Sequence, residues 1–187
     1  MANMRCAFYR LSRGMAISMN RDPAIVTRRW GGKLTAPVAA CHHAGMSEII
    51  FPRSPRETMD GWAHLPRYID KIRLHLAGKL HPDYQPNFGA RGFDKNWLEA
   101  AGVTHEQMVE VVRHSITDGQ VCDWVKRHVK RSAADKAALL AKMLNYPRPD
   151  DAEGMARLKM RKEQAGLADC EQIKNFVDFI DAEEKRS

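Results

Sequence analysis

The chain has 187 residues, enough for one domain with an extension and too few for two full domains. Its formal net charge is +7, but residues 1–45 alone carry +6, with seven basic side chains against Asp22, so the rest of the chain is nearly neutral. This distribution argues against sequence-specific nucleic-acid binding by residues 46–187. No run of apolar residues reaches the length that crosses a membrane.

Residues 1–45 are predicted to be a disordered extension or the product of an over-extended gene start. They show neither helical nor strand periodicity, whereas Met46 resembles a translation start that leads directly into a well-formed segment. We therefore expect a single domain over residues 46–187. The four cysteines have no CxxC or other paired spacing, which favours a reducing, cytoplasmic setting.

Residues 54–80 are predicted to hold two helices. Ser54 and Glu57 have the spacing of a capping box, which predicts a short helix ending near Gly61. A second helix is expected to begin at Pro66, because the residue before a proline is pushed away from helical dihedral angles. Apolar residues then recur at helical spacing and predict a buried side, at Leu65, Ile69, Ile72, Leu76 and Leu80.

A separate basic stripe, Arg67, Lys71 and His75, follows this second helix at intervals of four residues. One interpretation is a solvated face whose long side chains cover apolar surface. The other is a carboxylate or phosphate site in which Arg67 makes a two-point contact, Lys71 adds charge and His75 tunes the pH dependence. Trp62 or Tyr68 would supply an aromatic wall. The candidate ligand-binding residues are Trp62, His64, Arg67, Tyr68, Asp70, Lys71, His75, Tyr84 and Arg91.

Residues 81–93 are predicted to form a long irregular loop, because they hold two prolines and two glycines without periodicity. The part from Tyr84 to Arg91 is expected to cover the anion site, although a loop held down by its own aromatic side chains is an equally simple interpretation.

After residue 93 the sequence predicts one helix after another with short connections. The fold class is therefore all-α, a compact bundle of roughly seven or eight short helices that pack in antiparallel or orthogonal pairs. Helices are expected to start at or near Asp94, Thr104, Asp118, Ser132, Asp151 and Asp169.

No catalytic or metal motif is complete. The eight histidines include no HExxH pattern and no His or Cys pair at helical spacing, so neither a metal nor a cofactor is expected. Asp70 is spaced to pair with Arg73, and Asp118 is placed to cap a helix. The groups left for acid–base chemistry would be drawn from Asp70, Asp118, Asp123, His64 and His75.

A second basic cluster, Lys126, Arg127, Lys130 and Arg131, closes one of the predicted helices. Cations at the carboxyl end of a helix interact favourably with the helix dipole. A structural role is therefore the simpler interpretation of this cluster.

Several segments together are similar to a known family. They are SPRE from Ser54, HLPRYIDKIRLHLAGKL from His64, GFD at residues 92–94 followed by Trp97 and Leu98, TDGQVCDWV from Thr117, and FVDFIDAEE near the end. The family they resemble is a bacterial one of unknown function, the one numbered 5069. The resemblance covers about residues 54–187. It implies a soluble bacterial helical domain, and it carries no activity, cofactor or catalytic residue with it.

We expect the chain to be a binding module for an anionic small molecule or an anionic group. Two alternatives stay open: an enzyme acting on a phosphorylated or carboxylated small molecule, and a protein–protein adaptor that uses exposed tryptophans. An enzyme requires a closed cleft with a carboxylate and a histidine within hydrogen-bond reach. A binding module requires a cationic pocket, and an adaptor requires a flat apolar patch.

Overall fold

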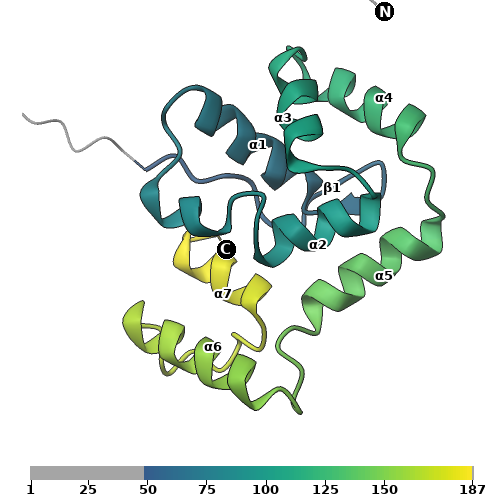
Figure 1. Ribbon diagram of the computed structural model, residues 1–187. Coiled ribbons are helices and arrows are strands. Elements are labelled where there is room, and N and C mark those ends of the chain that lie inside the picture. Colours follow the sequence, from purple (N-terminus) through teal and green to yellow (C-terminus); the bar gives the residue numbers. More distant parts are fainter. Residues whose placement is uncertain (1–48, 187) are drawn as a thin grey trace, which may run out of the picture. The chain divides into compact units, whose positions relative to one another are not determined.

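The computed structural model describes residues 49–186, which form seven α-helices, one 3₁₀-helix and a two-stranded sheet (Figure 1). The all-α prediction is confirmed, because each strand is only two residues long. The predicted extension, residues 1–45, lies outside the described residues. The elements in chain order are β1 (Thr58–Met59), β2 (Trp62–Ala63), α1 (Leu65–Leu76), η1 (Pro82–Asn87), α2 (Gly92–Ala101), α3 (His105–Arg113), α4 (Asp118–His128), α5 (Ala133–Leu144), α6 (Ala152–Gln164) and α7 (Phe176–Glu183).

Capping boxes begin four of these helices, α3, α4, α5 and α7. α3 and α5 start where the sequence predicts. α4 also starts at Asp118 as predicted, but its cap is Thr117 rather than Asp118, and the predicted start at Asp169 is wrong because Asn175 caps α7. Each true cap has extended backbone and a side-chain oxygen that accepts a hydrogen bond from an N–H of the first turn, which is what an N-cap requires.

The helix predicted at residues 54–61 is wrong, and a turn followed by a β-hairpin takes its place. Ser54 Oγ accepts a hydrogen bond from the N–H of Arg56 at 3.1 Å, which closes a local turn. Asp60 and Gly61 join the two strands with φ angles of 51° and 76°. Positive φ at both central residues is typical of a two-residue hairpin turn, and Asp-Gly is its usual sequence signal. That signal outweighs the capping-box spacing.

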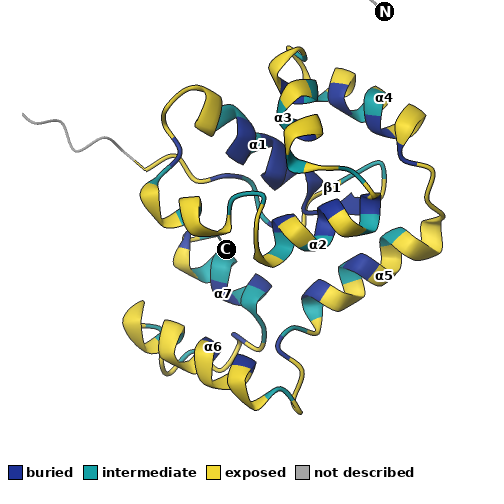
Figure 2. Cartoon of the chain, in the orientation of Figure 1, coloured by how far each residue is buried: buried dark blue, intermediate teal, exposed yellow. Residues whose placement is uncertain are grey.

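The main hydrophobic core lies between the hairpin and helices α1 to α5, and Figure 2 shows α1 buried along most of its length. The rings of Trp62 and Trp97 meet edge to face with their centroids 5.9 Å apart. The predicted apolar side of α1 is confirmed except at Leu76, which is 39% exposed. The remaining α1 residues of this core are Leu65, Tyr68, Ile69 and Ile72.

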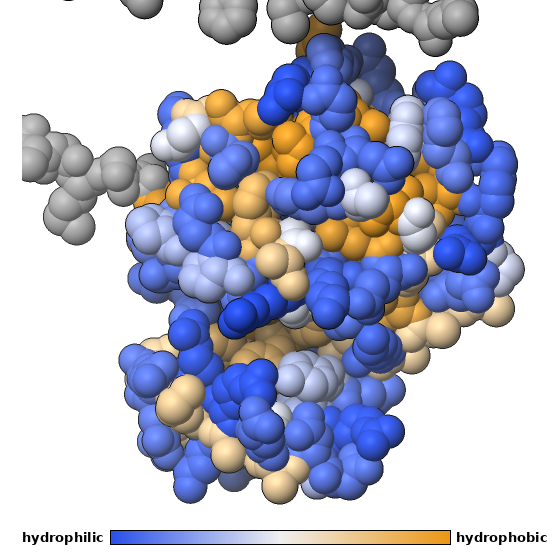
Figure 3. Space-filling view, in the orientation of Figure 1, coloured by the Kyte–Doolittle hydropathy of each residue, from blue (hydrophilic) through white to orange (hydrophobic). Residues whose placement is uncertain are grey.

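The later helices extend this core on one side. α5 packs against β2 and α2, and α7 contacts both α5 and α6. A second apolar cluster, Leu158, Ile173 and Phe179, joins α6 to α7. In the space-filling view of Figure 3, hydrophobic side chains gather in the upper half over α1 to α3, while the surface around α6 is mainly polar. Within residues 49–186, every helix is too short or too polar to cross a membrane.

Candidate functional site

The structure divides the predicted ligand-binding residues into two groups. Asp70 and Arg91 stand apart, because Asp70 accepts two hydrogen bonds of 2.8 Å from Arg53, while the Arg91 side chain is exposed and has no hydrogen-bond or ion-pair partner in the described chain. The predicted pair of Asp70 with Arg73 is wrong, because Arg73 binds Asp118 at 2.6 Å instead. The residues that do come together around α1 are Trp62, His64, Arg67, Tyr68, Lys71, His75 and Tyr84.

Arg67 is buried, and a carboxylate of the chain itself occupies its guanidinium. Nη1 and Nη2 of Arg67 donate to the two carboxylate oxygens of Glu184 at 2.9 and 2.5 Å, and Nη1 also donates to the carbonyl oxygen of Pro52 at 3.1 Å. The Tyr84 hydroxyl donates to the same carboxylate at 2.6 Å. Burial would raise the pKa of Glu184, but the hydrogen bond and charge of Arg67 hold that pKa below its usual value. The predicted two-point contact is thus made within the chain.

Lys71 belongs to a second buried contact, centred on Asp94. The Asp94 carboxylate accepts from Lys71 Nζ at 2.6 Å, from His64 Nε2 at 2.7 Å and from the Gly89 N–H at 3.0 Å. Burial would raise the pKa of Asp94, but the Lys71 charge and the His64 hydrogen bond hold it well below its usual range. The prediction that Asp94 caps a helix is wrong, because α2 begins at Gly92 and Asp94, at its third position, is 1% exposed.

His64 is itself unusual in backbone and environment. It precedes α1 with a φ of 68°, which is uncommon for a residue other than glycine, and its side chain is 2% exposed. With Nε2 bound to Asp94, its Nδ1 has no hydrogen-bond partner in the described chain. Together, His64, Asp94, Lys71, Arg67, Glu184 and Tyr84 form a buried set of polar groups that we call the α1 network.

The loop after α1 packs beside this network. The Phe88 ring sits between the imidazoles of His75 and His105, with centroid distances of 4.8 and 4.7 Å. Tyr68, beneath it, shares a 2.6 Å hydrogen bond with His105 Nδ1. A side chain at Gly89 would lie 2.0 Å from His105 Nδ1, so the close approach of the loop requires glycine there.

The second basic cluster behaves differently, and we call it the α4 cationic end. In the described part of the chain, none of its four cations forms an ion pair; the contacts made by Arg127, Lys130 and Arg131 are to backbone carbonyl oxygens, at 3.1, 3.0 and 2.8 Å. Each of the four side chains is exposed. The cluster comprises Lys126, Arg127, Lys130 and Arg131.

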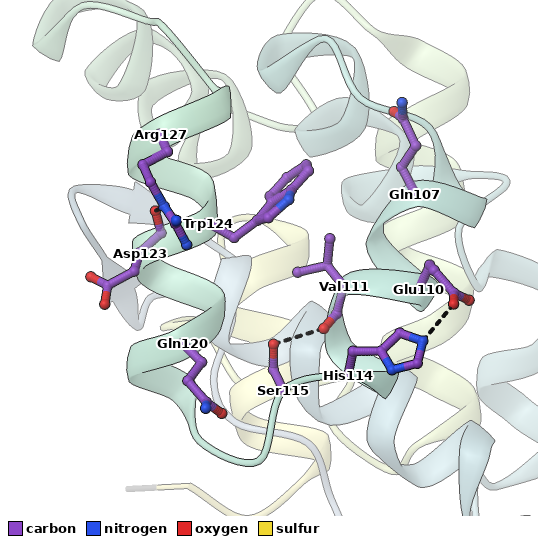
Figure 4. A pocket seen from close by; sticks show the side chains of 9 residues that line it. All are labelled: Gln107, Glu110, Val111, His114, Ser115, Gln120, Asp123, Trp124 and Arg127. Carbon is purple, nitrogen blue, oxygen red and sulfur yellow. Dashed lines mark hydrogen bonds and ion pairs between the residues drawn. The ribbon is translucent and has the colours of Figure 1, made fainter.

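A groove of about 590 Å³ runs between α3 and α4 beside this cluster (Figure 4). Trp124 extends from α4 toward α3, Val111 lies next to it, and Arg127 stands at the α4 side. His128 stacks on Trp124, with centroids 4.4 Å apart and ring planes inclined by 16°. The groove could not be predicted from the sequence, because its two walls come from different helices whose packing is not visible in either segment alone. A tryptophan flanking the buried side of α4 is the signal that points to it.

The stability of the domain is expected to decrease as the pH falls below about 6.5. Burial lowers the pKa of His64 from its ordinary value of 6.5, although Asp94 opposes this, so the unfolded chain binds a proton there before the folded chain does. Burial lowers the pKa of His105 in the same direction. The free energy of unfolding should fall by up to about 1.4 kcal/mol per pH unit from His64 alone, until its folded pKa is reached.

Urea unfolding at about pH 7.5 and about pH 5.5 measures this decrease. The control is His64→Asn, because asparagine tolerates positive φ and carries no group that titrates between these pH values. The variant should lose less stability between the two pH values than the wild type. An equal loss would show that His64 does not titrate differently on folding.

Comparisons with known proteins place the chain in a family without assigning an activity. Among residues 49–186, no three His, Cys, Asp or Glu side chains gather as a set of metal ligands. No curated protein matches the chain. Residues 49–186 match the model of a family described as Domain of unknown function (DUF5069), which confirms the resemblance carried by the sequence segments. The chain belongs to this DUF5069 family.

Proposed function

We propose that the domain is a binding module for an anionic small molecule, and that the α4 cationic end holds the anionic group. The observation that carries this proposal is the contrast between two basic clusters. Arg67 and Lys71 are neutralised by Glu184 and Asp94, whereas the four cations at the end of α4 are exposed and without ion pairs in the described chain. Of these two clusters, only the second offers an incoming phosphate or carboxylate donors that are exposed and free of ion pairs.

The α1 network is a poor place for an external anion. Arg67 and Glu184 are each 4% exposed, and Lys71 is 6% exposed against Asp94 at 1%. A ligand would have to displace a carboxylate that the chain holds at high effective concentration, and it would leave that carboxylate buried without its partner. We therefore assign the predicted basic stripe of α1 a structural role in this proposal.

The helix dipole accounts for the position of only two of the four cations in the α4 cationic end. Cations in the last turn of a helix are stabilised by about 0.3–1 kcal/mol each, and the effect fades within that turn. Lys126 and Arg127 lie in the last turn of α4, but Lys130 and Arg131 follow the helix end at His128. The second pair extends the positive surface past the region that the dipole stabilises.

The two alternative functions have weaker support. The carboxylates considered for acid–base chemistry, Asp70 and Asp118, are held by Arg53 and Arg73. A carboxylate and a histidine meet at 2.7 Å in two places of the described chain. Asp94 and His64 are 1% and 2% exposed, which withholds them from a substrate, and Glu110 and His114 lie at the exposed end of α3 beside an open groove rather than in a closed cleft. An adaptor would use exposed tryptophan, and Trp124 is half-buried, with polar and charged residues such as Gln120, Asp123 and Arg127 beside it rather than a continuous apolar patch. A bacterial, cytoplasmic setting remains part of the proposal.

Binding of pyrophosphate to the full chain, measured by isothermal titration, tests the proposal. The variant Arg127→Gln/Lys130→Gln/Arg131→Gln should bind about tenfold or more weakly than the wild type, because three exposed cations that could contact the anion are removed. The affinity of the wild type should also fall as salt is added.

The matched control is Lys95→Gln/Arg148→Gln/Arg157→Gln, which removes the same charge from cations paired with Glu99, Asp150 and Glu153. This control also accounts for any binding by the basic residues 1–45, since both variants retain them. Equal weakening in the two variants, or no binding by the wild type, would overturn the proposal.

A further inference from the structure

We infer that the ligand is a phosphorylated compound with a flat aromatic ring, of the nucleotide kind, whose ring enters the α3–α4 groove. This inference rests on the proposed function and names the chemical class of its ligand. The groove and the α4 cationic end are continuous, because Arg127 belongs to both. One ligand of modest size therefore reaches an aromatic wall and a set of cations at once.

Trp124 supplies the wall. Its side chain crosses the space between the helices in Figure 4. The exposed His128 stacks on the indole, with the two ring centroids 4.4 Å apart. Stacking on His128 and partial burial against the main core restrict the indole to one orientation. A fixed indole loses little conformational freedom when an aromatic ring stacks on it, which is why such platforms recur where proteins bind bases.

The helix geometry places the phosphate contact next to this wall. Arg127 follows Trp124 by three residues on α4, so the two side chains are neighbours on one face of the helix. The Nε of Arg127 donates to the carbonyl oxygen of Asp123 at 3.1 Å, which anchors the side chain and leaves its two Nη groups for a phosphate. Lys130 and Arg131 continue the positive surface beyond it.

The two carboxylates that line the groove, Glu110 and Asp123, are placed so that they do not repel a phosphate at Arg127. Glu110 accepts hydrogen bonds from Arg113 at 2.8 Å and from His114 at 2.7 Å, so its charge is already engaged by its own helix. Asp123 lies on the rim, and its carboxylate points away from Trp124 in Figure 4.

Both walls of the groove offer polar side chains in fixed positions, Gln107 on α3 and Gln120 on α4. Gln107 and Gln120 line the groove, and each uses its amide oxygen to accept a backbone N–H at a helix start, from Thr104 at 2.9 Å and from Thr117 at 3.1 Å. These bonds hold the two side chains and leave their amide NH₂ groups as donors. Ring nitrogens and carbonyl oxygens of a base are acceptors that such donors recognise.

Binding of adenosine 5′-monophosphate and of ribose 5-phosphate to the full chain tests the inference, because the two probes share the phosphate and differ in the ring. The wild type should bind the nucleotide about 5- to 100-fold more tightly, the range that stacking of one base supplies. In Trp124→Leu, which keeps an apolar side chain against the core, this preference should disappear while the affinity for ribose 5-phosphate stays unchanged. Circular dichroism establishes that the variant is folded.

A second readout does not depend on that variant. In an NMR titration of the wild type, the nucleotide should shift the indole N–H signal of Trp124 and the backbone signals of α3, and ribose 5-phosphate should shift only the signals near Arg127 and Lys130. Equal affinity for the two probes, with no ring-dependent shift at Trp124, would overturn the inference and leave the anion site standing. Failure of both probes to bind would overturn the inference and the proposed function together.

Discussion

Replacing Asp94 with alanine is expected to lower the free energy of unfolding by about 3–5 kcal/mol. Asp94 is the single acceptor that neutralises Lys71 and binds His64 Nε2, and all three side chains are at most 6% exposed. Without it, a buried ammonium and a buried imidazole lose their partner, and the Gly89 N–H loses its acceptor as well. The large cost comes from those stranded groups rather than from the lost attraction alone.

Urea unfolding of Asp94→Ala at neutral pH measures this cost, and Asp123→Ala is the matched control. Asp123 is also an aspartate on a helix, but it is exposed and its carboxylate has no ion-pair partner in the described chain. Its replacement should change stability by no more than about 0.5 kcal/mol. A cost below about 1 kcal/mol for Asp94→Ala would show that the α1 network is not buried in solution as the structure has it.

Glu184→Ala is expected to be the second severe change, with a loss of about 3 kcal/mol, and Arg67→Met should cost a similar amount. Glu184→Ala leaves Arg67 buried with no counterion in the described chain, and Arg67→Met leaves Glu184 with the partly exposed Arg186 as its one remaining cation there. The double variant Arg67→Met/Glu184→Leu removes both charges and replaces them with apolar groups of comparable size. It should be more stable than the sum of the two single losses implies, because no stranded charge remains.

The double-mutant cycle is compared with one at Arg157 and Glu153, an exposed pair at helical spacing with 47% and 86% of the side chains accessible. There the coupling should be about 0.5 kcal/mol or less. Additive losses at Arg67 and Glu184 would contradict the interpretation that their charges stabilise each other in a dry environment.

The helices after residue 101 could largely be read from the sequence, because each carries its own start signal within four residues. Thr104 with Gln107 is an example, where both reciprocal hydrogen bonds are present. The hairpin could also have been read, since Asp60-Gly61 is a strong local turn signal. That stretch holds two local signals that predict different structures. The capping-box spacing at Ser54 predicts a helix, and Asp60-Gly61 predicts the hairpin that forms.

The surroundings of α1 could not be read in this way. Periodicity places Arg67 and Lys71 on one face, but whether that face meets water depends on residues far away in the chain. Their partners, Glu184 and Asp94, are separated from them by 117 and 23 residues. Asp94 even carried a local signal for a different role, a helix cap. The sequence alone therefore does not show whether a basic side chain is free to bind a ligand or is already paired with a carboxylate of the same chain.

The contact between Arg67 and Glu184 also sets an order of events during synthesis of the chain. Arg67 is added to the chain 117 residues before Glu184, so its guanidinium lacks this carboxylate while α1 to α6 are being made. The Tyr84 hydroxyl donates to the same carboxylate, so the loop that carries Tyr84 also lacks this anchor until Glu184 has been added. The nascent domain therefore stays open at this edge and closes only when its last helix has emerged.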